Sequence, residues 1–160
     1  MNKQRLLEQI LIELERVRLV ALNAVIQASE TATSKETIAR SKYETFGLEA
    51  SYLAHGQAMR MAECDEDLAK FKELTLQDFD ESSSVALGAL ITLFDENDKE
   101  QMIFLGPAAG GLKVNASLQE IVVITPSSPL GKALIGKKLD DEVELLIGDN
   151  KKSYEIITLQ

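Results

Sequence analysis

The sequence predicts an α+β protein, in which an N-terminal antiparallel two-helix coiled-coil hairpin precedes a mostly antiparallel β-sheet with one short helix. Three observations predict this class. Apolar residues recur at helical spacing through the first half of the chain, an acidic and serine-rich stretch interrupts the pattern, and short apolar runs separated by turn residues follow it. We expect the hairpin over residues 1–75, a linker over 76–84 and a compact domain over 85–160.

Two long helices are predicted because two series of apolar or small residues alternate steps of three and four, which is the spacing of a coiled-coil seam. No proline occurs before Pro107, so nothing in the first half of the chain forces a helix to break. The first series comprises Leu7, Ile10, Leu14, Val17, Ala21, Ala24 and Ala28, and the second Tyr43, Gly47, Ala50, Ala54, Gln57, Met61, Cys64, Leu68 and Phe71.

The chain is expected to reverse direction within SETATSKET, residues 29–37. Serine and threonine compete there with the backbone for hydrogen bonds and provide N-caps for a new helix. A register centred near Thr33 would give a hairpin about 45 Å long, at about 1.5 Å per residue for helices of about 30 residues.

The second half of the chain predicts a small sheet. VALGALITLF and KEQMIFLG flank the turn-forming DENDK and indicate a β-hairpin. EIVVITP and EVELLI predict further strands, and SYEIITL is expected to pair back across GDNKK. The stretch GPAAGG lacks the lysine and hydroxyl residue of a phosphate-binding loop, so we interpret it as a connection.

One short helix is predicted inside SPLGKALIGKKLDDEVEL. Ser128 suits the N-cap, Pro129 suits the first helical position, and Gly136 is a C-terminal stop. The helix should lay an apolar side on the sheet. A small basic cluster then projects from an otherwise acidic domain: Lys132, Lys137 and Lys138.

Composition excludes several classes of protein. The net charge of −9 is unsuited to gripping bare DNA. Cys64 is the only cysteine, so an intramolecular disulfide and a cysteine-based zinc site are excluded, and we expect a cytoplasmic protein. The charged residues within MNKQRLLEQILIELERVRLV argue against a signal peptide or a membrane-spanning helix.

SPLGKALIGKKLDDEVEL, followed by a strand hairpin, resembles the C-terminal signature of the bacterial Gre-type (GreA/GreB) transcription elongation factors, and the chain looks like a divergent member. The resemblance extends to the architecture, since these proteins join an N-terminal coiled-coil hairpin to an FKBP-like C-terminal domain. It implies a protein that binds RNA polymerase and inserts the coiled coil into the secondary channel, with indirect contact to nascent RNA. Ser128, Pro129, Lys132 and Lys137 are the docking residues that the motif suggests; for Ser128 and Pro129, capping alone explains the sequence equally well.

In cleavage-competent relatives, two tip carboxylates spaced Asp-x-x-Glu help to hold a second Mg²⁺ in the polymerase active site. The matching stretch here is TSKE, with Glu36 on the Glu position and Thr33 where the Asp is expected. A hydroxyl brings no charge to the metal, so Glu30 would have to compensate for it. The resemblance thus implies Glu36, with Glu30, as ligands of a Mg²⁺ shared with polymerase, and no intrinsic cofactor. The alternative is that both acids are solvated helix-end charges.

Three functions stay open at this point. The chain stimulates polymerase to cleave backtracked RNA, without being an enzyme itself, or it occupies the same channel as a non-cleaving regulator. The third is an FKBP-like prolyl isomerase or chaperone. This last function is disfavoured because the C-terminal half offers few aromatic residues for an isomerase pocket: Phe79, Phe94, Phe104 and Tyr154.

Overall fold

The computed structural model describes residues 1–33 and 44–160. They form two compact units: Leu11–Ala69, and Met1–Ile10 together with Lys70–Gln160. The first unit holds most of a helical hairpin and the second holds the sheet. The domain boundaries expected from the sequence, at residues 75 and 85, stay a prediction.

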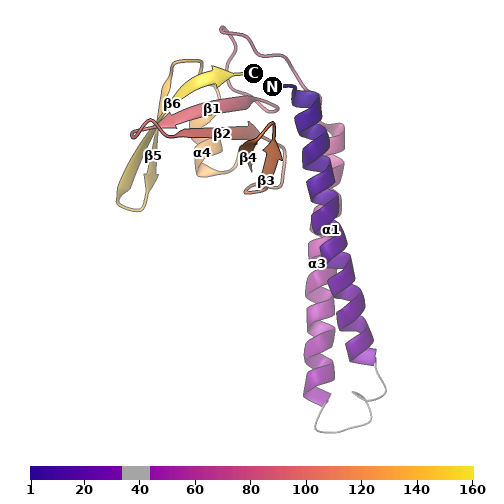
Figure 1. Ribbon diagram of the computed structural model, residues 1–160. Coiled ribbons are helices and arrows are strands. Elements are labelled where there is room, and N and C mark those ends of the chain that lie inside the picture. Colours follow the sequence, from indigo (N-terminus) through magenta and orange to yellow (C-terminus); the bar gives the residue numbers. More distant parts are fainter. Residues whose placement is uncertain (34–43) are drawn as a thin grey trace. The chain divides into compact units, whose positions relative to one another are not determined.

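The hairpin consists of helices α1 (Lys3–Thr33) and α3 (Glu44–Glu73), which run side by side in Figure 1. The predicted seam is confirmed over the described residues, because its members there are buried or half-buried on both helices; Tyr43 lies outside the described residues. In α1 these include Leu14, Ala21 and Ala28, and in α3 they include Ala50, Cys64 and Leu68. The small residues on both sides let the two backbones approach closely in the distal part of the seam.

The register of the two helices differs from the expectation. Arg18 on α1 forms an ion pair with Asp65 on α3, whereas a reversal centred near Thr33 would have placed Arg18 opposite Leu48. The register centred near Thr33 is therefore wrong. Residues 34–43, which include Glu36, lie outside the described residues.

The last turn of helix α1 includes threonines of the stretch 29–37. The Thr31 hydroxyl donates to the Gln27 carbonyl at 3.0 Å, and the Thr33 hydroxyl donates to the Ser29 carbonyl at 2.8 Å. These bonds reach back one turn and satisfy the hydroxyls without leaving the helix. Helix α1 thus ends at Thr33, within the stretch 29–37 where the chain was expected to reverse, and the rest of that stretch lies outside the described residues.

The second half forms one six-stranded sheet in the order β3-β4-β2-β1-β6-β5. The strands are β1 (Leu90–Asp95), β2 (Glu100–Leu105), β3 (Lys113–Ala116), β4 (Gln119–Ile124), β5 (Glu142–Ile147) and β6 (Asn150–Leu159). The predicted hairpins β1–β2 and β5–β6 are confirmed, and only the β2–β4 pair is parallel. The sheet is thus mostly antiparallel, as expected.

Both faces of the sheet are covered. Helix α4 (Pro129–Leu134) packs on one face, where Leu134 joins a core that includes Ile91, Leu93 and Ile103. On the other face Phe71, near the end of α3, is fully buried beside Gly106 and Val123. Figure 1 shows α4 lying against the strands.

Strand β3 was not predicted. Its sequence, KVNA, is short and mostly polar, and it follows a stretch that was interpreted as a connection. That connection is tied to β4 by backbone bonds: Gly106 N–H donates to Ile124 O at 2.8 Å and Gly111 N–H donates to Val123 O at 2.8 Å. Since β3 is held by pairing with β4 rather than by its own apolar pattern, the sequence carried no signal for it.

Candidate functional site

The first candidate site is helix α4, whose start is built as the sequence predicts. The Ser128 hydroxyl accepts a hydrogen bond from the Gly131 backbone N–H at 3.0 Å and donates to the Thr125 carbonyl at 2.7 Å. Pro129 occupies the first helical position. Ser128 is therefore engaged in capping and in closing the preceding turn, and its hydroxyl has no donor left for another molecule.

Glycine at position 131 sets how closely α4 approaches the preceding turn. A Cβ at this position would lie 1.9 Å from the Thr125 carbonyl oxygen, so no side chain fits there. At the other end Gly136 has a φ of +80°, which only glycine adopts readily. Two backbone bonds tie this end to the preceding segment: Gly136 N–H donates to Val85 O at 2.9 Å, and Val85 N–H donates to Lys137 O at 2.7 Å.

The outward side of this helix and the residues that follow it are exposed. Pro129, Lys132, Ile135, Lys137 and Lys138 are all exposed, and we call this set the α4 surface. Ile135 exposes 46% of its area next to the lysines. Among the described residues none of the three lysines forms an ion pair, although the Lys138 backbone N–H is held by Asp141. A rigid backbone thus presents unpaired positive charge beside apolar area.

The second candidate site is the far end of α1. Glu30 is exposed in the last turn of the helix, and the Thr33 hydroxyl is bonded back to Ser29. Glu36 lies outside the described residues, so the structure does not test whether Glu30 and Glu36 meet. Within residues 1–33 and 44–160 no three His, Cys, Asp or Glu side chains are grouped as a metal site would require.

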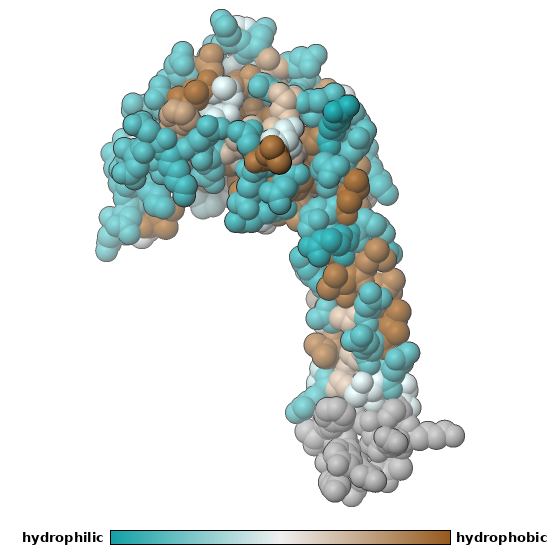
Figure 2. Space-filling view, viewed as in Figure 1, coloured by the Kyte–Doolittle hydropathy of each residue, from teal (hydrophilic) through white to brown (hydrophobic). Residues whose placement is uncertain are grey.

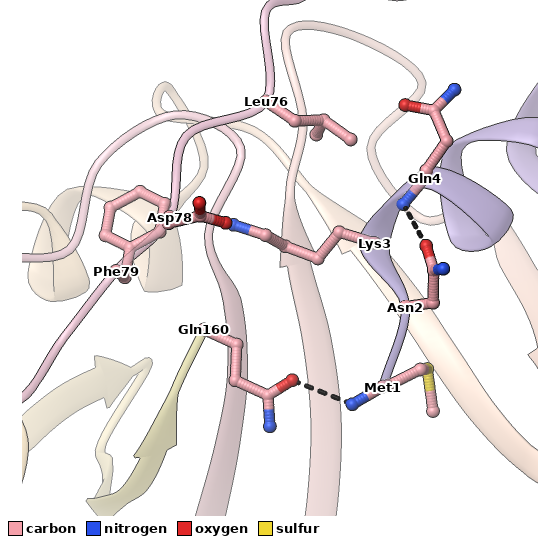
Figure 3. Close-up of a pocket in the computed structure, with 8 residues that line it drawn as sticks. All are labelled: Met1, Asn2, Lys3, Gln4, Leu76, Asp78, Phe79 and Gln160. Atoms are coloured by element: carbon pink, nitrogen blue, oxygen red, sulfur yellow. Dashed lines mark hydrogen bonds between the residues drawn. The ribbon is translucent and has the colours of Figure 1, made fainter.

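Sequence reasoning missed a third feature, a cavity of about 420 Å³ where the start of α1 meets the linker and the end of β6. Figure 3 shows Lys3 reaching across it toward Asp78 and Phe79. The Lys3 ammonium donates to the Gln77 carbonyl and lies 4.6 Å from the centre of the Phe79 ring. Burial lowers the pKa of Lys3, and Asp78 opposes that effect. The contacts of Lys3 with Gln77 and Phe79 join residues more than seventy positions apart, so no local sequence pattern predicts them.

Helix α1 also begins at this cavity. The Asn2 side chain caps α1 by accepting from the backbone N–H groups of Gln4 at 2.9 Å and Arg5 at 3.2 Å. Met1 and Gln160 are joined by a hydrogen bond of 2.9 Å between the amino nitrogen and Oε1 (Figure 3). The cavity is therefore lined by groups that are largely occupied in holding the chain together.

None of the helices in the described part of the chain is long and apolar enough to cross a membrane. The described fold defines a hairpin-and-sheet protein with a capped, outward-facing basic helix.

Comparison with known proteins assigns the family. The family model described as "Transcription elongation factor, GreA/GreB, C-term" matches residues 80–160, just over half of the chain. The chain therefore belongs to the GreA/GreB family of transcription elongation factors.

The individual relatives share about a third of the aligned residues with this chain. Transcription elongation factor GreA of Beijerinckia indica is 29% identical over 149 residues, which cover 92% of this chain and 88% of the relative. GreA of Trichlorobacter lovleyi is 36% identical over 78 residues, and GreA of Pelobacter propionicus is 31% identical over 103 residues. These two matches cover 48% and 63% of this chain but only 45% and 60% of the relatives' own lengths.

Two solved structures resemble this chain at low sequence identity. The structure titled "Structure of the transcription factor Gfh1" has a TM-score of 0.41 at 19% identity and covers 96% of this chain and 92% of its own. The GreA/GreB factor of Nitrosomonas europaea has a TM-score of 0.38 at 20% identity and covers 61% of this chain and 78% of its own.

Proposed function

We propose that this protein binds bacterial RNA polymerase in the cytoplasm and inserts its helical hairpin into the secondary channel. The observation that carries the proposal is the family match over residues 80–160 in a chain whose first half is a two-helix hairpin. The partner is a protein surface, and contact with nascent RNA follows only through the polymerase. The net charge of −9 supports this, because a strongly acidic chain is repelled by bare DNA.

In this proposal the α4 surface is the part of the chain that docks on the polymerase. Lys132 and Lys137 supply unpaired positive charge, and Pro129 and Ile135 supply apolar area on a backbone that Ser128 and Gly131 make rigid. Exposed charge steers association with an acidic partner, while apolar area contributes to affinity after contact. Ser128 acts in this proposal by holding the helix start rather than by touching polymerase.

The proposal includes two candidate functions for the end of the hairpin, where Glu30 and Glu36 lie in the sequence. Glu36, with Glu30, would share a Mg²⁺ with the polymerase and support cleavage of backtracked RNA, and carboxylate oxygens are the donors that Mg²⁺ prefers. Glu30 is exposed and fits that donor chemistry, but one described carboxylate is a weak ligand set alone. The chain would assist the polymerase active site and would not be an enzyme itself.

A non-cleaving channel regulator is the second candidate, and Thr33 favours it. Its hydroxyl is already donated to the Ser29 carbonyl at 2.8 Å, and it carries no charge with which to attract a metal ion. In that case the hairpin alters transcription by occupying the channel. A transcript-cleavage assay on stalled elongation complexes separates the two candidates: cleavage that is stimulated by the chain and lost in Glu36→Ala supports the assisting role, and no stimulation supports the regulator.

The docking proposal is tested by binding to purified RNA polymerase. Lys132→Glu combined with Lys137→Glu should weaken binding about tenfold or more, as loss of central charged anchors does. Lys99→Glu combined with Lys152→Glu is the matched control, because it reverses two exposed lysines elsewhere on the same unit and gives the same net charge. Equal affinity of the two variants would contradict docking through the α4 surface.

A further inference from the structure

The turn that joins β3 to β4 holds both of its residues in the left-handed backbone region. Ala116 pairs with Gln119, so the turn consists of Ser117 and Leu118 alone. Their φ angles are +52° and +66°. Two positive φ values are typical of a type I′ turn, which prefers asparagine and glycine because a bulky side chain is crowded by its own backbone in this region.

Leu118 is the residue that suits such a backbone least. The other non-glycine residues with positive φ in the described part of the chain have small or short polar side chains: Asp98, Ala109, Ser117 and Asp140. The two-residue turn between β5 and β6 has a glycine at its left-handed position, Gly148, with a φ of +62°. Leucine at position 118 therefore costs stability that glycine or asparagine would not cost.

No packing within the chain offsets this strain. Leu118 exposes 106% of its area, so no described residue covers its side chain. Because it is as exposed as in an unfolded chain, its apolar area contributes nothing to folding. A strained backbone position that the fold does not need is evidence of a role outside the fold.

The base of this turn is polar and is tied to the sheet. Lys113 Nζ and Glu120 Oε1 form an ion pair at 2.9 Å between β3 and β4, and Gln119 Nε2 donates to Glu100 Oε1 of β2 at 3.4 Å. Figure 2 shows that the surface over the sheet is mostly hydrophilic, with small hydrophobic patches. An apolar side chain raised from a polar base has the form of an anchor that enters a pocket of a partner protein.

We propose that Leu118 is a second contact with the partner of the α4 surface, an apolar anchor that enters a pocket on RNA polymerase. The proposal rests on the function proposed above, since it takes the same partner. Strand β4 connects the two contacts, because Leu118 directly precedes its first residue and the turn into α4 follows its last.

The spacing of the two contacts fits one interface. The six residues of β4 span about 20 Å at about 3.3 Å per residue. A standard interface covers about 800 Å² per partner, which is a patch about 30 Å across, so both contacts fit within it. A protein held at two separated points cannot rotate about either one. Leu118 thus fixes the orientation in which the sheet docks.

The two contacts differ in how they act on binding. The charges of Lys132 and Lys137 act before contact and mainly raise the association rate, in a manner that depends on salt. An apolar anchor acts only after contact, so it mainly lowers the dissociation rate. The two contributions can therefore be measured separately.

Surface plasmon resonance of the full chain on purified RNA polymerase tests the proposal. Leu118→Asn removes the apolar side chain, changes no charge and suits the left-handed region. It should raise the dissociation rate about fivefold or more and leave the association rate and its salt dependence unchanged. Its melting temperature should equal or exceed that of the wild type, because the strain is relieved.

Two further variants serve as controls. Leu146→Asn makes the same change at a leucine of β5 that exposes 76% of its area, and it should leave both rate constants unchanged. Leu118→Met keeps an apolar side chain at the turn and should retain most of the wild-type affinity.

The outcomes separate this proposal from the proposed function. A wild-type chain that does not bind polymerase contradicts the proposed function, and the anchor with it. A wild-type chain that binds, and binds as tightly with Leu118→Asn, overturns the anchor alone. The anchor is also overturned by an equal loss of affinity in Leu146→Asn, or by a Leu118→Asn protein whose melting temperature falls together with its affinity.

Discussion

The ring of Phe71 lies directly against the backbone of Gly106. A Cβ placed on Gly106 would stand 2.8 Å from Phe71 Cζ and 3.0 Å from Val123 Cγ1. Phe71 ends the buried seam of α3, and Val123 is a fully buried residue of β4. The packing between the last turn of α3 and the sheet therefore depends on the absence of a side chain at position 106.

Gly106→Ala should destabilise the fold by about 1–3 kcal/mol, because the added methyl group forces the ring or the strand to move in a packed core. Urea denaturation measures the change in the free energy of unfolding. Gly110→Ala is the control, since a Cβ there comes no closer than 3.4 Å to Thr125. Equal losses in the two variants would show that Phe71 does not pack on Gly106 as described.

Ser128→Ala should lower the free energy of unfolding by about 1 kcal/mol, because it removes the cap at the start of α4. The hydroxyl makes two hydrogen bonds, to Gly131 N–H and to Thr125 O. Ser127→Ala, at the exposed neighbouring serine, should change stability by less than about 0.5 kcal/mol. Thermal denaturation of both variants gives the comparison, and an unchanged Ser128→Ala protein would remove the capping role.

The pairing of Arg18 with Asp65 reports the register of the hairpin and can be measured by a double-mutant cycle. Truncating both to Ala should reveal a coupling of about 0.2–1 kcal/mol, the range for partly exposed ion pairs. A cycle between Arg16 and Asp65 should give no coupling, because Arg16 pairs with Glu13 on its own helix. Coupling in both cycles, or in neither, would argue against this register.

Acid should loosen the β1–β2 turn. The Asp95 carboxylate accepts the backbone N–H groups of Asn97 at 2.8 Å and Lys99 at 2.9 Å, and these bonds lower its pKa below the ordinary 3.8. The ionised form therefore stabilises the fold above pH 3.8, and this stabilisation is lost as the pH falls through the lower folded pKa.

The measurement for this turn is the free energy of unfolding of wild type and Asp95→Asn across that pH range. The variant should be less stable at neutral pH, and the difference should shrink in acid. Asp98→Asn, in the same turn, controls for the loss of one negative charge. A difference between wild type and Asp95→Asn that stays constant with pH would contradict the proposed role of the carboxylate.

Local patterns were sufficient for much of the fold. The seams of α1 and α3 were readable because heptad spacing and burial coincide, and α4 was readable because Ser128, Pro129 and Gly136 act through bonds within a few residues. Strand β3 was missed since pairing with β4 holds it, and the register was wrong because no sequence pattern records that Arg18 meets Asp65. The cavity around Lys3 depends likewise on contacts between chain segments distant in sequence.

Only part of the candidate site could be predicted from the sequence and checked in the structure. The capping role of Ser128 followed from its position before Pro129, and the structure confirms it. Docking by Lys132 and Lys137 stays a prediction, since the structure shows only that both are exposed. Metal binding by Glu36 with Glu30 also stays a prediction, because it depends on the polymerase as well as on a residue outside the described ones.

The central claim is that the end of the hairpin enters the polymerase secondary channel. Site-specific crosslinking from position 33 tests it most directly, with a Thr33→Cys variant carrying a short photoreactive group in a complex with stalled RNA polymerase. Thr33 is exposed at the end of α1, whereas the native Cys64 is buried and should stay unlabelled. Crosslinks to residues that line the channel or to the RNA 3′ end are predicted. Crosslinks confined to the outer surface of the polymerase would contradict the claim.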